Sequence, residues 1–110
     1  MINCNFTANT ATCDGGAVYF QNTGTVSNCN FTGNTATGSD SGGGAVFFDG
    51  EGTVLNCNFA GNTAISIGGA IYMGAGSVEN CNFTGNTATV LGGGAVYFNE
   101  SGTVENCNFT

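Results

Sequence analysis

The chain has 110 residues, and its seven acidic residues are accompanied by no lysine, arginine or histidine, so its formal net charge is −7. Without cationic side chains it cannot neutralise phosphates or anionic lipid headgroups, which excludes nucleic-acid binding and charge-driven membrane attachment. Salt bridges between side chains are also excluded, so the fold must rest on backbone hydrogen bonds and apolar burial. No apolar run approaches the roughly 20 residues of a membrane-spanning helix, so no membrane insertion is predicted.

An internal repeat accounts for almost the whole sequence. The string Asn-Cys-Asn-Phe occurs five times, with its cysteines spaced by 25, 28, 24 and 26 residues. Each unit continues with Thr-Gly-Asn-Thr-Ala-Thr, a variable stretch, Gly-Gly-Ala-Val-Tyr-Phe, a polar turn and Gly-Thr-Val, or close variants of these. We therefore divide one domain, 1–110, into coils 4–28, 29–56, 57–80 and 81–106 and a stub at 107–110.

Short strands are predicted within each unit. Gly-Gly pairs, Thr and Asn oppose a helix, whereas Ala-Val-Tyr-Phe and Gly-Thr-Val are β-branched and aromatic runs bounded by turn residues. A unit of this size cannot bury its apolar side chains alone, but it can when each strand pairs in parallel with its equivalent one coil away, at about 4.8 Å. The predicted fold is all-β, a right-handed parallel β-helix (solenoid) of about four coils with three short strands per coil.

Stacking turns each sequence position into a row along the solenoid axis. Alternation along a strand places the valine of Gly-Thr-Val, and the cysteine and phenylalanine of Asn-Cys-Asn-Phe, on the inner face. The predicted core rows are Val26, Val54, Val78 and Val104; Cys4, Cys29, Cys57, Cys81 and Cys107; and Phe6, Phe31, Phe59, Phe83 and Phe109.

A bend is predicted between the valine and the cysteine, because the alternation slips by one residue there. Asparagine tolerates left-handed backbone angles, and stacked side-chain amides can hydrogen-bond along the axis, so an asparagine ladder suits this bend. The bend ladder comprises Asn28, Asn56, Asn80 and Asn106, and a second asparagine ladder runs through Asn9, Asn34, Asn62 and Asn86.

The strand that follows the glycines is oriented by its tyrosine. Alternation puts Val18 and Phe20 on one face and Tyr19 on the other, and we predict that Val18 and Phe20 face inward because tyrosine keeps a polar end for water. The outward aromatic ladder, which is also a candidate binding ladder, then comprises Tyr19, Phe47, Tyr72 and Tyr97.

Two alternating motifs carry a family resemblance. Phe-x-x-Asn begins at Phe6, Phe31, Phe59 and Phe83, and it alternates with Gly-Gly-Ala-Val or Gly-Gly-Ala-Ile. This pattern resembles the repeats of chlamydial polymorphic outer membrane proteins and of adhesin-like surface proteins of bacteria and methanogenic archaea. The resemblance implies a right-handed β-helix exposed outside the cell and used for adhesion or surface structure.

The aligned cysteines allow three interpretations. A metal site needs thiolates that converge from different directions, whereas a row sets them in line at about 4.8 Å. Disulfides between coils would be strained, because in-register side chains leave the Cβ atoms too far apart. Buried free cysteines that act as small apolar groups are favoured, and Cys13 lies outside the row.

Enzyme chemistry is not predicted. The carboxylates of glycosidases and lyases on this kind of fold are clustered and usually stand beside a base, whereas here the acids are scattered over loops and turns. Glu79 and Glu105 occupy equivalent positions on adjacent coils and are interpreted as solvated charges. No catalytic residue, metal or cofactor is therefore predicted.

Exposed polar residues suggest two further hypotheses. A Thr-x-Thr pattern at 10–12, 35–37 and 87–89 resembles the array of ice-binding β-helices, although Ile65 interrupts it, and threonine is common in any exposed strand. Outside a cell, five N-glycosylation sequons are candidate modification sites: Asn5, Asn30, Asn82, Asn99 and Asn108.

The two ends of the chain carry the main functional hypothesis. Both ends are in repeat phase and without a cap, so they present unpaired strand edges. Either the chain is a segment of a longer solenoid, or copies of it stack head to tail into an extracellular filament. A surface adhesin that binds glycan or protein is the alternative. The residues expected at the stacking ends are Asn3, Cys4, Asn5, Phe6, Asn106, Cys107, Asn108 and Phe109.

Overall fold

The computed structural model describes residues 1–110, which form fourteen strands and no helix. The strands make three parallel sheets, here called A, B and C. Sheet B contains β1 (Asn5–Thr7), β5 (Asn30–Thr32), β8 (Asn58–Ala60), β11 (Asn82–Thr84) and β14 (Asn108–Phe109). Sheet C contains β2 (Thr10–Ala11), β6 (Thr35–Ala36), β9 (Thr63–Ala64) and β12 (Thr87–Ala88). Sheet A contains β3 (Val18–Phe20), β4 (Gly24–Ser27), β7 (Val46–Leu55), β10 (Ile71–Glu79) and β13 (Val96–Glu105).

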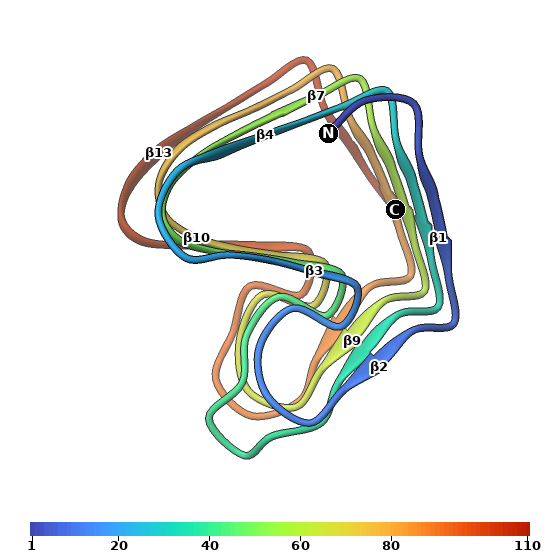
Figure 1. The fold of residues 1–110 in the computed structure, drawn as a ribbon, viewed down its shortest axis with the longest axis vertical. Coiled ribbons are helices and arrows are strands. Elements are labelled where there is room, and N and C mark those ends of the chain that lie inside the picture. Colours follow the sequence, from blue (N-terminus) through green and yellow to red (C-terminus); the bar gives the residue numbers. More distant parts are fainter.

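Equivalent positions of successive repeats pair with one another in every sheet. Phe6 lies beside Phe31 in sheet B. Val18 lies beside Val46 in sheet A. Seen along the solenoid axis, successive coils nearly superimpose (Figure 1). The predicted all-β parallel solenoid, with about four coils and three strands per coil, is therefore confirmed. Because the structure contains no helix, no helical segment is available to cross a membrane.

Sheet A departs from the predicted strand pattern. In the second to fourth coils the aromatic run, the expected polar turn and the Gly-Thr-Val run form one bent strand of nine or ten residues. The turn stays in the sheet because its backbone pairs with the adjacent coil, as where the Gly50 N–H donates to the Asn22 carbonyl oxygen at 3.1 Å. The third coil is shorter here, and a register shift between Met73 and Ala75 absorbs the difference.

Identical side chains stack inside the solenoid. The rings of Phe31, Phe59 and Phe83 are at most 1% exposed. Adjacent rings of this row lie 4.8–5.0 Å apart with planes within 6° of each other. Glycine is required opposite a second aromatic row, because a Cβ atom at Gly52 would lie 2.7 Å from the ring of Phe48. The sequence repeat is thus a packing repeat as well.

Each coil turns from sheet A into sheet B at an asparagine with left-handed backbone geometry. Asn28, Asn56, Asn80 and Asn106 have φ angles between 52° and 54°. Asparagine is the non-glycine residue best suited to this region, because its short side chain bonds locally. The bend therefore lies where the slip in alternation predicted it.

Connections between sheets C and A bulge away from the main solenoid. These side loops comprise residues 12–17, 37–45, 65–70 and 89–95, and they form the lower lobe of Figure 1. The Gly-Gly pair of each repeat belongs to its side loop. At Gly44 an added Cβ atom would lie 2.0 Å from the carbonyl oxygen of Gly69, so adjacent side loops are in backbone contact.

Candidate functional site

Hydrogen bonds satisfy the aligned thiols, and all six cysteines are free. The Cys57 thiol donates to the carbonyl oxygen of Leu55 at 3.1 Å, and its sulfur accepts the backbone N–H of Cys29 at 3.4 Å. The same two bonds recur at Cys29 and Cys81. No group of three or more metal-ligating side chains gathers anywhere in the chain. The cysteine row therefore packs as small core groups with their polar atoms paired.

Burial and hydrogen bonds between neighbouring cysteines set the thiol pKa values in this row. Cys29 is 0% exposed, and burial raises the pKa of its thiol. A side-chain hydrogen bond with Cys57, together with burial, raises the pKa of the Cys81 thiol, and the same bond lowers the pKa of the Cys57 thiol to about 7. Because the thiolate is the nucleophile, the Cys29 and Cys81 thiols, which stay neutral, are chemically inert at physiological pH.

Side-chain amides form two ladders along the axis, and neither lies at the bend. The Asn28 amide donates to the Ser27 hydroxyl at 3.2 Å and not to the next coil, so the expected amide ladder does not run through the bend residues. The bend amide is open to water, which can take the place of a neighbouring amide. A buried ladder instead occupies the second asparagine row, Asn9, Asn34, Asn62 and Asn86.

In the buried ladder, Asn62 uses its full hydrogen-bonding capacity. Its carboxamide oxygen accepts the backbone N–H of Asn34 at 2.9 Å and the Asn34 amide at 3.0 Å. Its nitrogen donates to the Asn86 amide oxygen at 2.9 Å and to the Phe31 carbonyl oxygen at 3.0 Å. Asn62 is 0% exposed, so its ladder contacts replace water completely.

The second ladder lies on the outer face of sheet B. From the sequence, four of its members were named as glycosylation sequons and two of these as stacking-end residues, but the ladder itself was not predicted. Each amide nitrogen donates to the preceding coil, for example Asn58 to the Asn30 oxygen at 2.8 Å. The ladder comprises Asn5, Asn30, Asn58, Asn82 and Asn108. Of the sequon asparagines in this row, Asn5 alone has a nitrogen that donates to no neighbour, and the sequon at Asn99 lies on the sheet A bend.

The aromatic ladder lies outside the main core, but its ring faces are covered. Tyr19, Phe47, Tyr72 and Tyr97 stack with centroids 4.4–5.5 Å apart and planes within 12°. Phe47 is only 9% exposed, whereas Tyr19 at the end of the row is 50% exposed. Burial, and then the neighbouring Tyr97, raise the pKa of Tyr72. Sugars bind aromatic side chains over the ring face, so this ladder offers a glycan mainly ring edges and hydroxyl groups.

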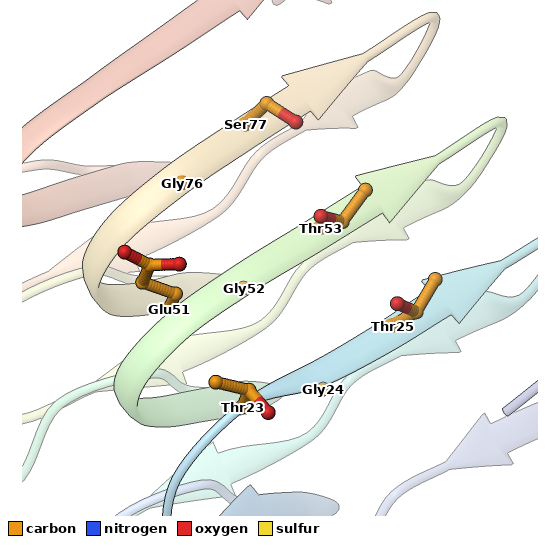
Figure 2. Close-up of a pocket in the computed structure, with 8 residues that line it drawn as sticks. All are labelled: Thr23, Gly24, Thr25, Glu51, Gly52, Thr53, Gly76 and Ser77. Atoms are coloured by element: carbon orange, nitrogen blue, oxygen red, sulfur yellow. The ribbon is translucent and has the colours of Figure 1, made fainter.

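An open groove of about 450 Å³ lies on the outer face of sheet A, as Figure 2 shows. Hydroxyls of Thr25, Thr53 and Ser77 stand in one row on neighbouring strands, and Glu51 lies near the bend. The lining contains one carboxylate and no base, so it offers hydrogen bonds and no acid–base pair. Thr23 and the glycines Gly24, Gly52 and Gly76 complete the lining.

One acid, Asp14, and one residue of the Thr-x-Thr pattern, Thr37, make hydrogen bonds between coils. The Asp14 carboxylate accepts the Gly42 N–H at 2.8 Å and so ties two side loops together. Glu79 pairs in register with Glu105, as expected from their equivalent positions. The Thr37 hydroxyl donates to the Ala11 carbonyl oxygen at 3.2 Å, which removes it from an ice-facing array.

The repeat also identifies the protein family. The family described as Chlamydia polymorphic membrane protein (Chlamydia_PMP) repeat matches residues 3–21, 28–49 and 56–74, which is more than half of the chain. The chain belongs to the Chlamydia polymorphic membrane protein repeat family. Each matched PMP repeat begins at the asparagine bend into sheet B and ends just after the aromatic run of sheet A. No curated protein and no solved structure matches the chain.

Membership in this family agrees with the resemblance predicted from the sequence, and it assigns the chain to a general class of protein. PMP repeats are found in surface and outer-membrane proteins, so the chain is a surface repeat protein with a β-solenoid fold. The fourth coil lies outside the matched segments, yet its strands pair with the equivalent strands of the third coil in all three sheets, with one register shift in sheet A. It is thus a further repeat of the same structural kind.

Proposed function

We propose that the chain is a non-enzymatic structural protein of the cell surface and that its solenoid extends by end-to-end stacking of coils into an extracellular fibre. The observation that carries the proposal is the complementarity between the two end coils. One end presents a hydrogen-bond donor and the other end the matching acceptor, and these two groups occupy the same positions as the bonded pairs between inner coils.

Polar groups at the ends complement each other along the buried amide ladder. Within the ladder, each amide nitrogen donates to the oxygen of the following coil, as from Asn34 to Asn62. At the first coil, Asn9 donates to Asn34, and its own oxygen has no donor. In the last coil, Asn86 donates only to the Phe59 carbonyl oxygen and keeps one N–H free. A first coil placed on a last coil joins this donor to this acceptor.

Apolar rows also stop at the ends. Val104 is 41% exposed and Phe109 is 51% exposed, whereas their inner equivalents Val78 and Phe83 are at most 1% exposed. Burial of such side chains under a further coil contributes about 25 cal/mol per Å² of apolar surface. Stacking thus extends the core as well as the sheets.

Strand counts impose one condition on this stacking. Sheet B has five strands, whereas sheet C has four, because β1 and β14 occupy equivalent places at opposite ends. When β2 of one copy pairs with β12 of another, β1 and β14 compete for the same place on β11. Residues 3–7 and 106–110 have the same sequence, Asn-Cys-Asn-Phe-Thr, so either segment can fill it. End-to-end stacking therefore displaces one of them.

Light scattering after size exclusion, with electron microscopy, tests the proposal on the full chain and on a chain that ends at residue 105. We expect fibres from both, with faster growth for the shorter chain because nothing has to be displaced. Val104→Lys places a charge in the stacking surface and should stop fibre growth. Thr103 is the adjacent residue and faces outward, so the control variant Thr103→Lys should still form fibres. A monodisperse monomer at high concentration, for both lengths of chain, would refute the proposal.

Adhesion remains a second candidate, supported by membership of a family of surface proteins. The candidate ladder would bind through the edges and hydroxyls of Tyr72 and Tyr97. Replacement of both tyrosines by Ala should abolish glycan binding on an array and leave fibre formation unchanged. Retained binding by the double variant would exclude this ladder as the adhesive surface.

A further inference from the structure

The seven acidic side chains leave one side of the solenoid without charge. Asp14 and Asp40 lie in side loops, and the other five lie along sheet A, at its bend or at its end. The strands of sheets B and C carry no charged residue. Because the chain has no cationic side chain, the acidic surfaces of sheet A and of the side loops repel those of a second copy, whereas the outer face of sheet B does not.

The outer face of sheet B consists of two regular polar rows. The first is the exposed asparagine ladder, whose amides are aligned by hydrogen bonds of 2.8–2.9 Å between coils. The second row comprises Thr7, Thr32, Ala60, Thr84 and Thr110. All of these residues are exposed except Ala60, which is half-buried. Each ladder asparagine still has a second amide hydrogen directed to no protein acceptor.

We propose that this face of sheet B binds the same face of a second copy of the chain, side by side, with the two solenoid axes parallel. A two-fold axis parallel to the solenoid sets the asparagine row of each copy against the threonine row of the other. Large side chains then face small ones, as Asn58 faces Ala60 of the other copy, and the spare amide hydrogens face hydroxyl oxygens. Alternation of large and small groups is what close packing of two sheets needs.

Charge favours the parallel arrangement too. Ser27, Leu55, Glu79 and Glu105 form the border of sheet A next to sheet B. The parallel two-fold axis puts this border in each copy against the uncharged edge of sheet B that leads into sheet C. The glutamates of the two copies therefore lie on opposite sides of the contact.

Size sets the expected strength of the contact. Five strands at about 4.8 Å and about three residues at about 3.3 Å give a face of roughly 240 Å² per copy. This is smaller than a standard stable interface, so pairing of two single chains is weak. Each coil added to the solenoid enlarges the face, so pairing strengthens with length.

Sedimentation velocity of the full chain tests the proposal, in reductant and from about 10 μM to about 2 mM, a range suited to weak association. The Val104→Lys background prevents end-to-end growth, so side-by-side pairing appears as a dimer and its failure is distinct from failure of fibre formation. We expect the dimer fraction to rise with concentration and with salt, because salt screens the repulsion between copies.

Two matched variants test whether the outer face of sheet B, and not that of sheet A, forms the contact. Ala60→Glu buries an unpaired charge in the contact and should weaken dimerisation at least about tenfold. Thr53→Glu adds the same charge on the outer face of sheet A and should leave dimerisation within about twofold of the parent. Ala60→Thr completes the threonine row and should preserve pairing. Circular dichroism of each variant establishes that the solenoid is folded.

Mixing two variants tests the arrangement. In the parallel pair, position 60 of one copy faces position 58 of the other, so Ala60→Glu mixed with Asn58→Lys should recover a mixed dimer. A parent that sediments as a monomer over the whole range overturns the proposal. Equal weakening by Ala60→Glu and Thr53→Glu overturns the choice of face. A parent that pairs while the mixture does not overturns the parallel arrangement.

Discussion

Asn62→Ala should destabilise the solenoid far more than the same change at Asn58 in the same coil. The Asn62 side chain makes four hydrogen bonds in the protein interior and is 0% exposed. At about 1 kcal/mol each, their loss lowers the free energy of unfolding by about 4 kcal/mol. The buried backbone N–H of Asn34 is also left without its acceptor, which adds to the loss.

Asn58 is the matched control, because it also lies in an amide ladder. It makes two ladder bonds, to Asn30 at 2.8 Å and from Asn82 at 2.9 Å, but water can replace both on the exposed face. The expected loss for Asn58→Ala is therefore less than about 1 kcal/mol. Urea unfolding followed by circular dichroism measures both. Similar losses for the two variants, or a loss below about 1 kcal/mol at Asn62, would refute the assignment of stability to buried amides.

Three further predictions concern the backbone and the thiols. Asn56→Ala should lower the free energy of unfolding by about 1 kcal/mol in urea, because alanine lacks asparagine's tolerance of φ 53°, and Asn56→Gly should be nearly neutral. Gly44→Ala should prevent folding, as judged by circular dichroism, because its Cβ would lie 2.0 Å from a carbonyl oxygen of the next coil, while Gly92→Ala, with nothing within 4 Å, should fold. The melting temperature should fall as pH rises above about 9, because the pKa values of Cys29 and Cys81 are raised in the folded protein and the unfolded chain therefore loses these protons first. Each thiol should then lower the free energy of unfolding by about 1.4 kcal/mol per pH unit. A melting temperature constant up to pH 10.5 would contradict the last of these.

Repetition made the fold predictable from one sequence. A strand that recurs at each coil must pair with its own copy, so the register of Phe6 beside Phe31 follows from the spacing alone. Alternation also located the slip between valine and cysteine, and hence the bend at Asn28. Local patterns of this kind predict the fold because the same strands and the same bend recur in every coil.

Details that depend on the neighbouring coil were not predictable. Asp49 and Glu51 look like turn residues, yet their stretch is held in β7 because the adjacent coil pairs with its backbone. The amide ladder that includes Asn62 was predicted, but the ladder expected at Asn28 is absent and the outer ladder was missed, because an amide ladder depends on which side chains face one another across coils. The ring faces of Phe47 are covered by Tyr19 and Tyr72 of the adjacent coils, which alternation within a single strand does not reveal.

The thiol row places one cysteine in every coil, each held by its hydrogen bonds to adjacent backbone. Cys29, Cys57 and Cys81 are buried in the inner coils, while Cys4 and Cys107 are half-buried at the two ends. A reagent that modifies thiols reaches the three buried thiols only when their coils open, whereas the half-buried thiols at the ends are partly accessible from the start. The protein thus contains a reporter for every coil, and the order in which the five thiols react records how the solenoid frays from its ends toward its middle.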